Sequence, residues 1–167
     1  TTYFYLDGSS TQVKYDVNLK LHDSKKLILG DADDLQIYHD SSNSYIKADG
    51  TGDLYIRQDT ADKDIIFQSD DGSGGTDTYF FLDGSTSSTV FPDSKYLYFG
   101  TGHDMRVYFD GTNGYFQQIN GNMIIRQSQD DGDIIFQNDD GSGGIAEYFK
   151  LDGSAATHDG SATTALY

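Results

Sequence analysis

Short runs of alternating apolar and polar residues fill this chain, and turn-forming residues separate the runs. In one run Met105, Val107 and Phe109 fall on one side of an extended strand, and Arg106 and Tyr108 fall on the other. No stretch keeps the 3.6-residue apolar period of a helix. Strands of about five residues, recurring about every 8–12 positions, are typical of all-β proteins. The sequence therefore predicts an all-β fold.

Six strands are expected in each half of this pattern. Asx-Gly pairs such as Asn120-Gly121 mark turns between them, because Asn and Gly adopt positive φ at little cost. The expected strands of the first half are Leu27–Leu29, Leu35–His39, Ser44–Ala48, Asp53–Gln58, Asp64–Gln68 and Thr78–Leu82. Those of the second half are Tyr96–Phe99, Asp104–Phe109, Gly114–Gln118, Asn122–Gln127, Asp133–Gln137 and Ala146–Leu151.

The alternation also predicts which sides of the strands face a core. We expect an inner side formed by Leu35, Ile37, Leu54 and Ile56, and an outer side formed by Gln36, Tyr38, Tyr55 and Arg57. An extra strand is expected within Val13–Leu19, where the residues also alternate.

The whole pattern repeats at a long, fixed period. DIIFQ at Asp64–Gln68 returns at Asp133–Gln137, and DDGSGG at Asp70–Gly75 returns at Asp139–Gly144. Such a period indicates a modular repeat architecture and argues against one unique active site. The expected division is the end of a preceding repeat (1–10), a junction (11–23), repeat copy 1 (24–85), a junction (86–93), repeat copy 2 (94–154) and a polar tail (155–167). Because the chain starts within a repeat, we expect it to be part of a longer protein.

Acidic residues dominate the charge. The chain has 26 Asp and one Glu against 11 Lys plus Arg, for a net charge of -16. Phosphate binding needs clustered Lys and Arg, so no nucleic-acid partner is expected. No apolar run reaches the roughly 20 residues of a membrane-spanning helix, so no membrane insertion is expected. Cysteine is absent, which excludes disulfides and thiolate chemistry.

Each expected inner face carries only two or three apolar residues per strand. A lone repeat built in this way would be marginal, because its hydrophobic burial barely offsets the entropy of ordering. Stacked copies or several chains wound together supply the missing contacts. Tyr38, Tyr55, Tyr98 and Tyr108 are candidates for contacts between chains.

All four histidines, His22, His39, His103 and His158, precede an aspartate. Neighbouring strand residues point to opposite faces, so these pairs do not form the His–Asp hydrogen bond of a general base. No Gly-x-Ser-x-Gly element is present either. We expect no catalytic residue and no enzyme activity. A ring of one His from each of several chains stays open as a metal site.

The two DDGSGG loops offer the carboxylates of Asp70, Asp71, Asp139 and Asp140. Calcium prefers several oxygen ligands of this kind. However, the spacing matches neither an EF-hand nor a calcium-binding β-roll. We therefore interpret the loops as turns, expect no cofactor, and retain the four aspartates as candidate calcium ligands.

Four tyrosines recur at matching positions of the two copies, namely Tyr38, Tyr45, Tyr108 and Tyr115. Exposed tyrosines on a β surface can stack on sugars, which makes these residues the candidate glycan-binding set. Packing of the protein against itself explains the same pattern and is the preferred interpretation.

The string DLQIYHDSSNSYIKADGTGDLYIRQD at Asp34–Asp59, together with DIIFQSDDGSGG and YFFLDGS, resembles repeats in tail-fibre and virion structural proteins of marine bacteriophages. The resemblance spans roughly Tyr3–Ser154. It implies a homotrimeric, extracellular fibre of the virion with a β-helix-like or β-prism-like shaft. No receptor-site residue carries over from it.

The expected function is therefore structural: a shaft or spike segment that partners copies of itself, serves host attachment and can touch host-surface glycan. Three alternatives stay open. They are a glycan-binding receptor-recognition module, a polysaccharide depolymerase, and a bacterial surface adhesin built as a single-chain β-solenoid.

Overall fold

The computed structural model describes residues 4–7 and 12–155, with side chains from Tyr15 onward. Regular structure in these residues is β-strand throughout, apart from one short 3-10 turn, η1 (Gly153–Ala155). The expected all-β class is confirmed. No helix in the described ranges is long and apolar enough to cross a membrane. His158 and the predicted tail beyond Ala155 lie outside the described residues.

The chain forms two compact units, 1–63 and 64–167, and the boundary falls inside repeat copy 1. The first unit holds a hairpin, β1 (Phe4–Asp7) and β2 (Gln12–Tyr15), and one three-stranded sheet, β3 (Lys26–Leu29), β4 (Leu35–His39) and β5 (Ser44–Ala48). The second unit holds a sheet of β6 (Ile65–Asp70), β7 (Thr76–Asp83) and β8 (Ser88–Val90), a sheet of β9 (Leu97–Phe99), β10 (Met105–Phe109) and β11 (Gly114–Gln118), and a hairpin of β12 (Ile134–Asp139) and β13 (Ile145–Leu151).

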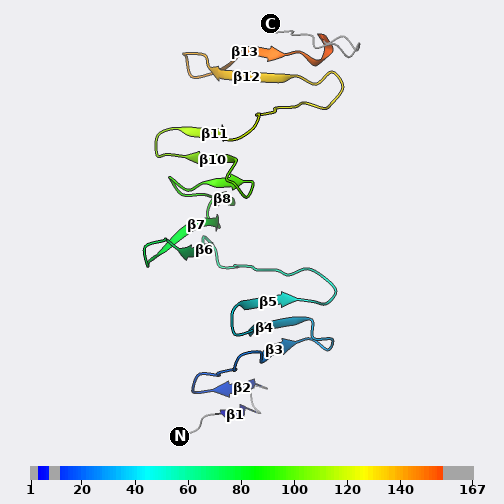
Figure 1. The fold of residues 1–167 in the computed structure, drawn as a ribbon, viewed down its shortest axis with the longest axis vertical. Coiled ribbons are helices and arrows are strands. Elements are labelled where there is room, and N and C mark those ends of the chain that lie inside the picture. Colours follow the sequence, from blue (N-terminus) through cyan, green and yellow to red (C-terminus); the bar gives the residue numbers. More distant parts are fainter. Residues whose placement is uncertain (1–3, 8–11, 156–167) are drawn as a thin grey trace. The chain divides into compact units, whose positions relative to one another are not determined.

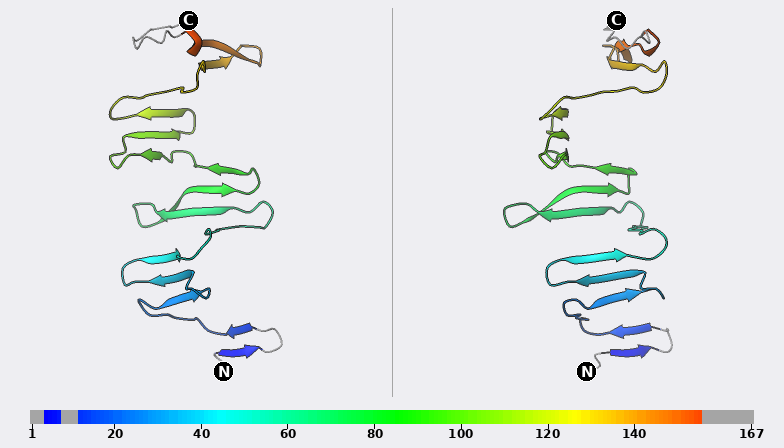
Figure 2. Two further views of the ribbon diagram at one scale, coloured as in Figure 1. Left: turned by 90° about the vertical axis from the view of Figure 1, so that its right-hand side faces the viewer. Right: turned by 45° about the vertical axis from the view of Figure 1, so that its right-hand side comes forward.

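Within each sheet, every strand pairs antiparallel with the strand next to it in sequence, so each sheet is a simple meander (Figures 1 and 2). The repeat extends to the register of the strands. Leu35 in β4 lies opposite Leu29 and Ala48. Its counterpart Met105 in β10 lies opposite Phe99 and Gln118. The two copies therefore repeat the same pairing as well as similar residues.

A β-bulge recurs in the same way in the β6–β7 and β12–β13 pairs. The register shifts in the middle of each pair, which leaves Tyr79 and Tyr148 without an opposite residue. The hydroxyl of Tyr79 donates to the carbonyl oxygen of Asp70, and that of Tyr148 to the carbonyl oxygen of Asp139, both at 2.9 Å. The extra residue is thus tied to its partner strand instead of disrupting the hairpin.

Two expected strands are wrong. The segments 53–58 and 122–127 carry no strand pairing, and Figure 1 draws both as chain without an arrow. No backbone hydrogen bond joins Leu54–Gln58 or Met123–Gln127 to the rest of the described chain. Alternating residues give a segment strand propensity, but a strand also needs a partner, and the described chain provides none.

The remaining strand predictions agree with the structure to within one or two residues, with one exception, and the structure adds two strands that were not expected, β1 and β8. The extra strand expected within Val13–Leu19 is shorter and earlier, because β2 ends at Tyr15. β8 was not expected; it lies in the junction 86–93 and pairs with the end of β7.

The described residues contain no buried apolar side chain, and only Gln36, at 7% exposure, is buried at all. The expected alternation is confirmed, because Leu35 and Ile37 share one face of β4 while Gln36 and Tyr38 share the other. The expected burial is wrong, because Ile37 is 41% exposed and Gln36 is covered. Leu54 and Ile56, also expected inside, are exposed as well.

Positive φ values recur at matching turn positions, which shows that the turns repeat together with the strands. The turn between β4 and β5 has Ser41 at φ 87°, and the turn between β10 and β11 has Gly111 at φ 96°. A Cβ added to Gly111 would meet only Asp93 Oδ2, at an ordinary 3.7 Å. The two turns therefore differ at this position mainly in backbone strain, which falls on Ser41.

We predict opposite effects for exchanging these two residues. Ser41→Gly should raise the free energy of unfolding by about 1 kcal/mol, because glycine adopts positive φ without a Cβ penalty, and Gly111→Ser should lower it by about as much. Urea unfolding of both variants checks this. Equal signs for the two substitutions would contradict the strain argument.

Candidate functional site

Each three-stranded sheet presents one apolar face that stays largely exposed. The register places Leu27, Leu29, Leu35, Ile37 and Ile46 together on the β3–β5 apolar face. It places Leu97, Phe99, Met105, Val107, Phe109 and Phe116 together on the β9–β11 apolar face. Ile46 is 61% exposed and Phe116, at the matching position, is 58% exposed. Contiguous apolar surface of this kind marks an interaction site.

The opposite face of the β9–β11 sheet is polar and internally satisfied. The Arg106 guanidinium carbon lies 4.9 Å from the ring centre of Tyr96 and 4.8 Å from that of Tyr108. Arg106 Nε donates to Gln117 Oε1 at 2.9 Å, and Nη1 donates to the Tyr98 hydroxyl at 3.4 Å. The bond to Tyr98 raises the pKa of Arg106. Cation–π contacts and hydrogen bonds thus occupy this face.

The polar face of the β3–β5 sheet repeats the arrangement with other residues. Lys26 Nζ lies 4.8 Å from the ring centre of Tyr38 and donates to Gln36 Oε1 at 2.7 Å. Gln36 Nε2 donates in turn to the Asp33 carbonyl at 3.1 Å. These contacts explain why Gln36 is buried. Each sheet therefore covers its polar side itself and leaves its apolar side open, the reverse of an ordinary globular domain.

The four candidate glycan tyrosines are brought together as two cross-strand pairs on these polar faces. Tyr38 stacks on Tyr45 with ring centres 4.8 Å apart, and Tyr108 stacks on Tyr115 at 4.6 Å. Tyr38 and Tyr108 also carry a cation on or beside the ring, so neither offers two free ring faces to a sugar. The stacking favours the interpretation that these residues pack the protein against itself.

The outer tyrosine of each pair is also tied to the adjacent turn. A hydrogen bond to the Asp40 carboxylate raises the pKa of the Tyr45 phenol, and Asp110 does the same to Tyr115. Backbone amides of the turn hold the pKa of both aspartates below the usual value. The Tyr pairs are therefore braced structural elements at the ends of their strands.

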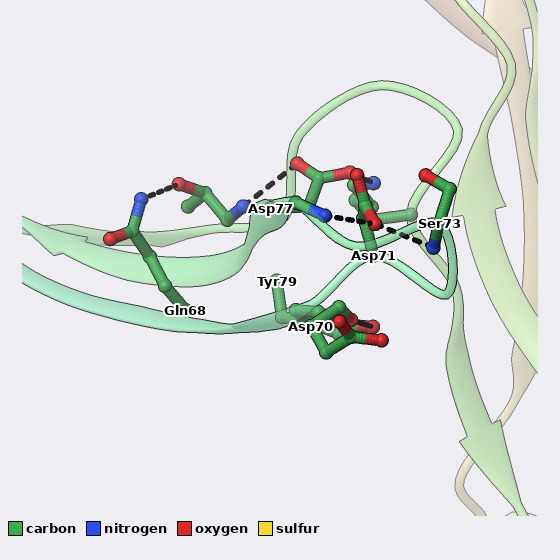
Figure 3. A network of polar contacts seen from close by, with 9 residues as sticks. Gln68, Asp70, Asp71, Ser73, Asp77 and Tyr79 are labelled. Carbon is green, nitrogen blue, oxygen red and sulfur yellow. Dashed lines mark hydrogen bonds and ion pairs between the residues drawn. The ribbon is translucent and has the colours of Figure 1, made fainter.

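The DDGSGG loops use their aspartates to hold the loop itself. Figure 3 shows the Asp71 carboxylate directed at its own loop, where Oδ1 accepts from the Ser73 and Gly75 amides at 2.7 and 3.0 Å. Asp140 does the same in the second loop, at 2.8 and 3.0 Å. These amides hold the pKa of Asp71 and Asp140 below the usual range. The contacts favour the turn interpretation of these loops.

The calcium prediction gains no support from the arrangement of acidic side chains. Within the described part of the chain, no three His, Asp or Glu residues gather in a group that could hold a metal ion. Asp70 and Asp139, the remaining candidates, contribute backbone carbonyls to the Tyr79 and Tyr148 hydrogen bonds.

Of the three histidines that the structure describes, His39 and His103 make side-chain contacts, and they make them with different residues. His39 Nδ1 lies 3.1 Å from Ser44 Oγ across the β4–β5 turn. The His103 ring stacks on Tyr98 with centres 4.3 Å apart. Neither ring is hydrogen-bonded to the aspartate that follows it, as the strand geometry predicts.

An aromatic pocket of about 410 Å³ in the second unit was not anticipated. It lies beside β7 and the segment that leads into β9, and its lining includes Asp77, Tyr79, Phe91, Lys95, Tyr96 and Tyr98. Lys95 pairs with Asp77 and lies 5.8 Å from the Tyr79 ring centre. The ion pair lowers the pKa of Asp77. The pocket thus combines aromatic rings with charged hydrogen-bonding groups.

The sequence does contain a signal for this pocket, which lies in the differences between the copies. Ala146 stands at the position of Asp77, Lys26 at that of Tyr96, and Ile28 at that of Tyr98. The set of lining residues is therefore assembled once in the described chain, where β7 meets the segment that leads into β9.

One ion-pair network also occurs in a single copy. Lys150 Nζ lies 2.9 Å from Asp133 Oδ2 and 3.1 Å from Asp152 Oδ2. Together with Ser154, it lowers the pKa of Asp152 to about 2, while the two carboxylates raise the pKa of Lys150. The corresponding residue in copy 1 is Phe81, so the earlier copy has no such network.

No known family model matches this chain, and neither a curated protein nor a solved structure shows significant similarity to it.

We predict a pH-dependent effect for Lys150→Met. The carboxylate pKa values are lowered in the folded state, so this stabilisation is complete above about pH 5 and disappears as the pH falls toward about 2. Lys150→Met should therefore lower the thermal midpoint at pH 6 and have a much smaller effect near pH 2. Thermal unfolding followed by circular dichroism measures both.

The control is Lys47→Met, which breaks the more exposed Lys47–Asp49 pair. Its effect at pH 6 should be the smaller one, because water and salt screen exposed pairs more strongly. A Lys150→Met effect that does not change with pH would show that the lost methylene packing, and not the charge, is responsible.

Proposed function

We propose that this chain is a structural segment of a phage tail fibre or spike, in which three copies assemble through their apolar faces. The observation that carries the proposal is the exposure of both apolar faces combined with the absence of any buried apolar side chain among the described residues. A folded chain of this size needs buried apolar surface for stability. Contacts with other chains can supply it.

Three features favour copies of the same chain as the partners. The β3–β5 and β9–β11 apolar faces have the same register, so each face of one copy can meet a matching face of another copy. Closed symmetric assemblies are the commonest oligomers of soluble proteins. A single-chain solenoid, the main alternative, buries its apolar faces between its own coils, and neither sheet shows such burial.

The fibre assignment rests on the resemblance of the repeat strings to those of phage fibre proteins, and an extracellular place on the virion follows from it. The hydrogen-bonded turns and the stacked rings recur in both copies, and such regular repetition suits a load-bearing shaft. That the chain is not an enzyme stays a prediction.

We predict a particle of three times the chain mass of 18.4 kDa in solution. Phe116→Asp, on the β9–β11 apolar face, should dissociate or unfold it, because a charge would be buried between chains. Gln117→Asp is the matched control, since it changes the neighbouring residue on the polar face beside Arg106. Multi-angle light scattering measures both. If the unsubstituted protein is a folded, stable monomer in solution, the proposal is wrong.

The aromatic pocket favours a second function, recognition of a glycan on a host surface. Tyr79 and Tyr96 are 46% and 42% exposed and can contact the apolar face of a sugar, and the paired Asp77 and Lys95 can bond hydroxyl groups. We predict that Tyr96→Ala weakens binding on a glycan array, while Tyr38→Ala, on a braced ring pair away from the pocket lining, does not. If Tyr96→Ala keeps every binding signal on the array, the pocket is not the glycan-binding site.

A further inference from the structure

The two segments that the sequence predicts as strands but the structure leaves unpaired share unusual properties. Leu54–Gln58 and Met123–Gln127 occupy the same place in the two copies, after β5 and β11. Their apolar side chains are also exposed. Tyr55 is 79% exposed and Ile124 is 72% exposed. Neighbouring exposed apolar residues at two matching positions mark a candidate interaction surface.

The backbone of these segments is equally unsatisfied. No backbone hydrogen bond within the described chain involves their peptide groups. At the C-terminal end of each segment, the side-chain oxygens of Gln58 and Gln127 accept hydrogen bonds from backbone amides of the next turn. A row of free N–H and C=O groups on an alternating segment is the surface to which another strand adds.

The nearest strand of the same chain is within reach but is not used. β5 ends at Ala48, and the connection to Leu54 has a length that is common in β-hairpins. The ladder continues for one more bond, from the Asp49 amide to the Asp34 carbonyl at 2.8 Å, and the chain then turns through Gly52 at φ 102°. The second copy turns in the same way, through Gly121 at φ 83°.

We propose that Leu54–Gln58 and Met123–Gln127 are strands that form between chains, each pairing with a second copy of this protein. This inference rests on the proposed assembly of three copies and assigns the residues that interlock them. The same segment of a symmetric neighbour carries the same alternation, so paired copies would bring identical apolar residues together.

The positive charge of Arg126, in the segment Met123–Gln127, also favours an acidic partner such as a further copy of the chain. Arg57 pairs with Asp59 in its own chain. In the second copy Ser128 stands at the position of Asp59, and Arg126 has no ion pair with the described residues. A chain of net charge -16 offers carboxylates to this guanidinium.

The first experiment is hydrogen exchange on the assembled protein, read by mass spectrometry. Amides of both segments should exchange at least about 100-fold more slowly than in a synthetic peptide of the same sequence, as paired strand amides do. Light scattering on the same sample separates the two proposals. A monomer overturns the assembly, whereas a trimer with fast exchange in both segments overturns only the inter-chain strands.

The second experiment identifies the partner strand and exploits the absence of cysteine. In a single-cysteine variant, any bis-maleimide crosslink must join two chains. Ile56→Cys and Ile125→Cys should give crosslinked dimers on a denaturing gel, while Thr112→Cys, in the exposed turn after β10, should not. Tyr55→Cys replaces Ile56→Cys if that variant does not assemble. Protected amides without any crosslink would mean pairing with the chain's own β5 and would overturn the inference.

Discussion

The structure depends on one constraint: a sheet of two or three short strands has two faces, and the side chains of the β3–β5 and β9–β11 sheets cover only one of them. The polar faces are closed by side chains of the same sheet, as Arg106 and Gln36 show. The apolar faces have no cover within either sheet. Hydrophobic burial is the main source of folding free energy, and neither sheet obtains it from its own side chains.

The contacts on the polar faces fix the register of the strands. Short, similar strands have weakly determined register, because a slip exchanges one set of apolar residues for another. Stacked pairs such as Tyr108 and Tyr115, and the hydrogen bond from Arg106 to Gln117, are satisfied in one register only. The bulge at Tyr79, with its hydroxyl bound to the partner strand, fixes the register of the hairpins in the same way. Polar contacts therefore specify the pairing, and apolar contacts stabilise it.

The sequence predicted those features that depend on neighbouring residues. Alternation located β4 and β10 within a residue, and the Asx-Gly steps located the turns, because both are properties of the local chain. The sequence failed where the outcome depends on a partner. The segment after β5 has the residue pattern of a strand. Strand propensity depends on the residues themselves, so it does not reveal that the peptide groups of this segment lack a pairing partner among the described residues. The candidate sites show the same limit, since the pocket at Tyr96 depends on which strands meet there.

The open faces also change how the protein responds to mutation. In a globular monomer, replacing one core residue removes one set of contacts. In the proposed assembly of identical chains, joined through the β3–β5 and β9–β11 apolar faces, a single codon change at Ile46 or Phe116 enters every subunit. Its free-energy effect is multiplied by the number of copies, and mixed particles are destabilised by a minority of altered chains. Such faces should therefore vary little between relatives, while the solvent-facing loops diverge.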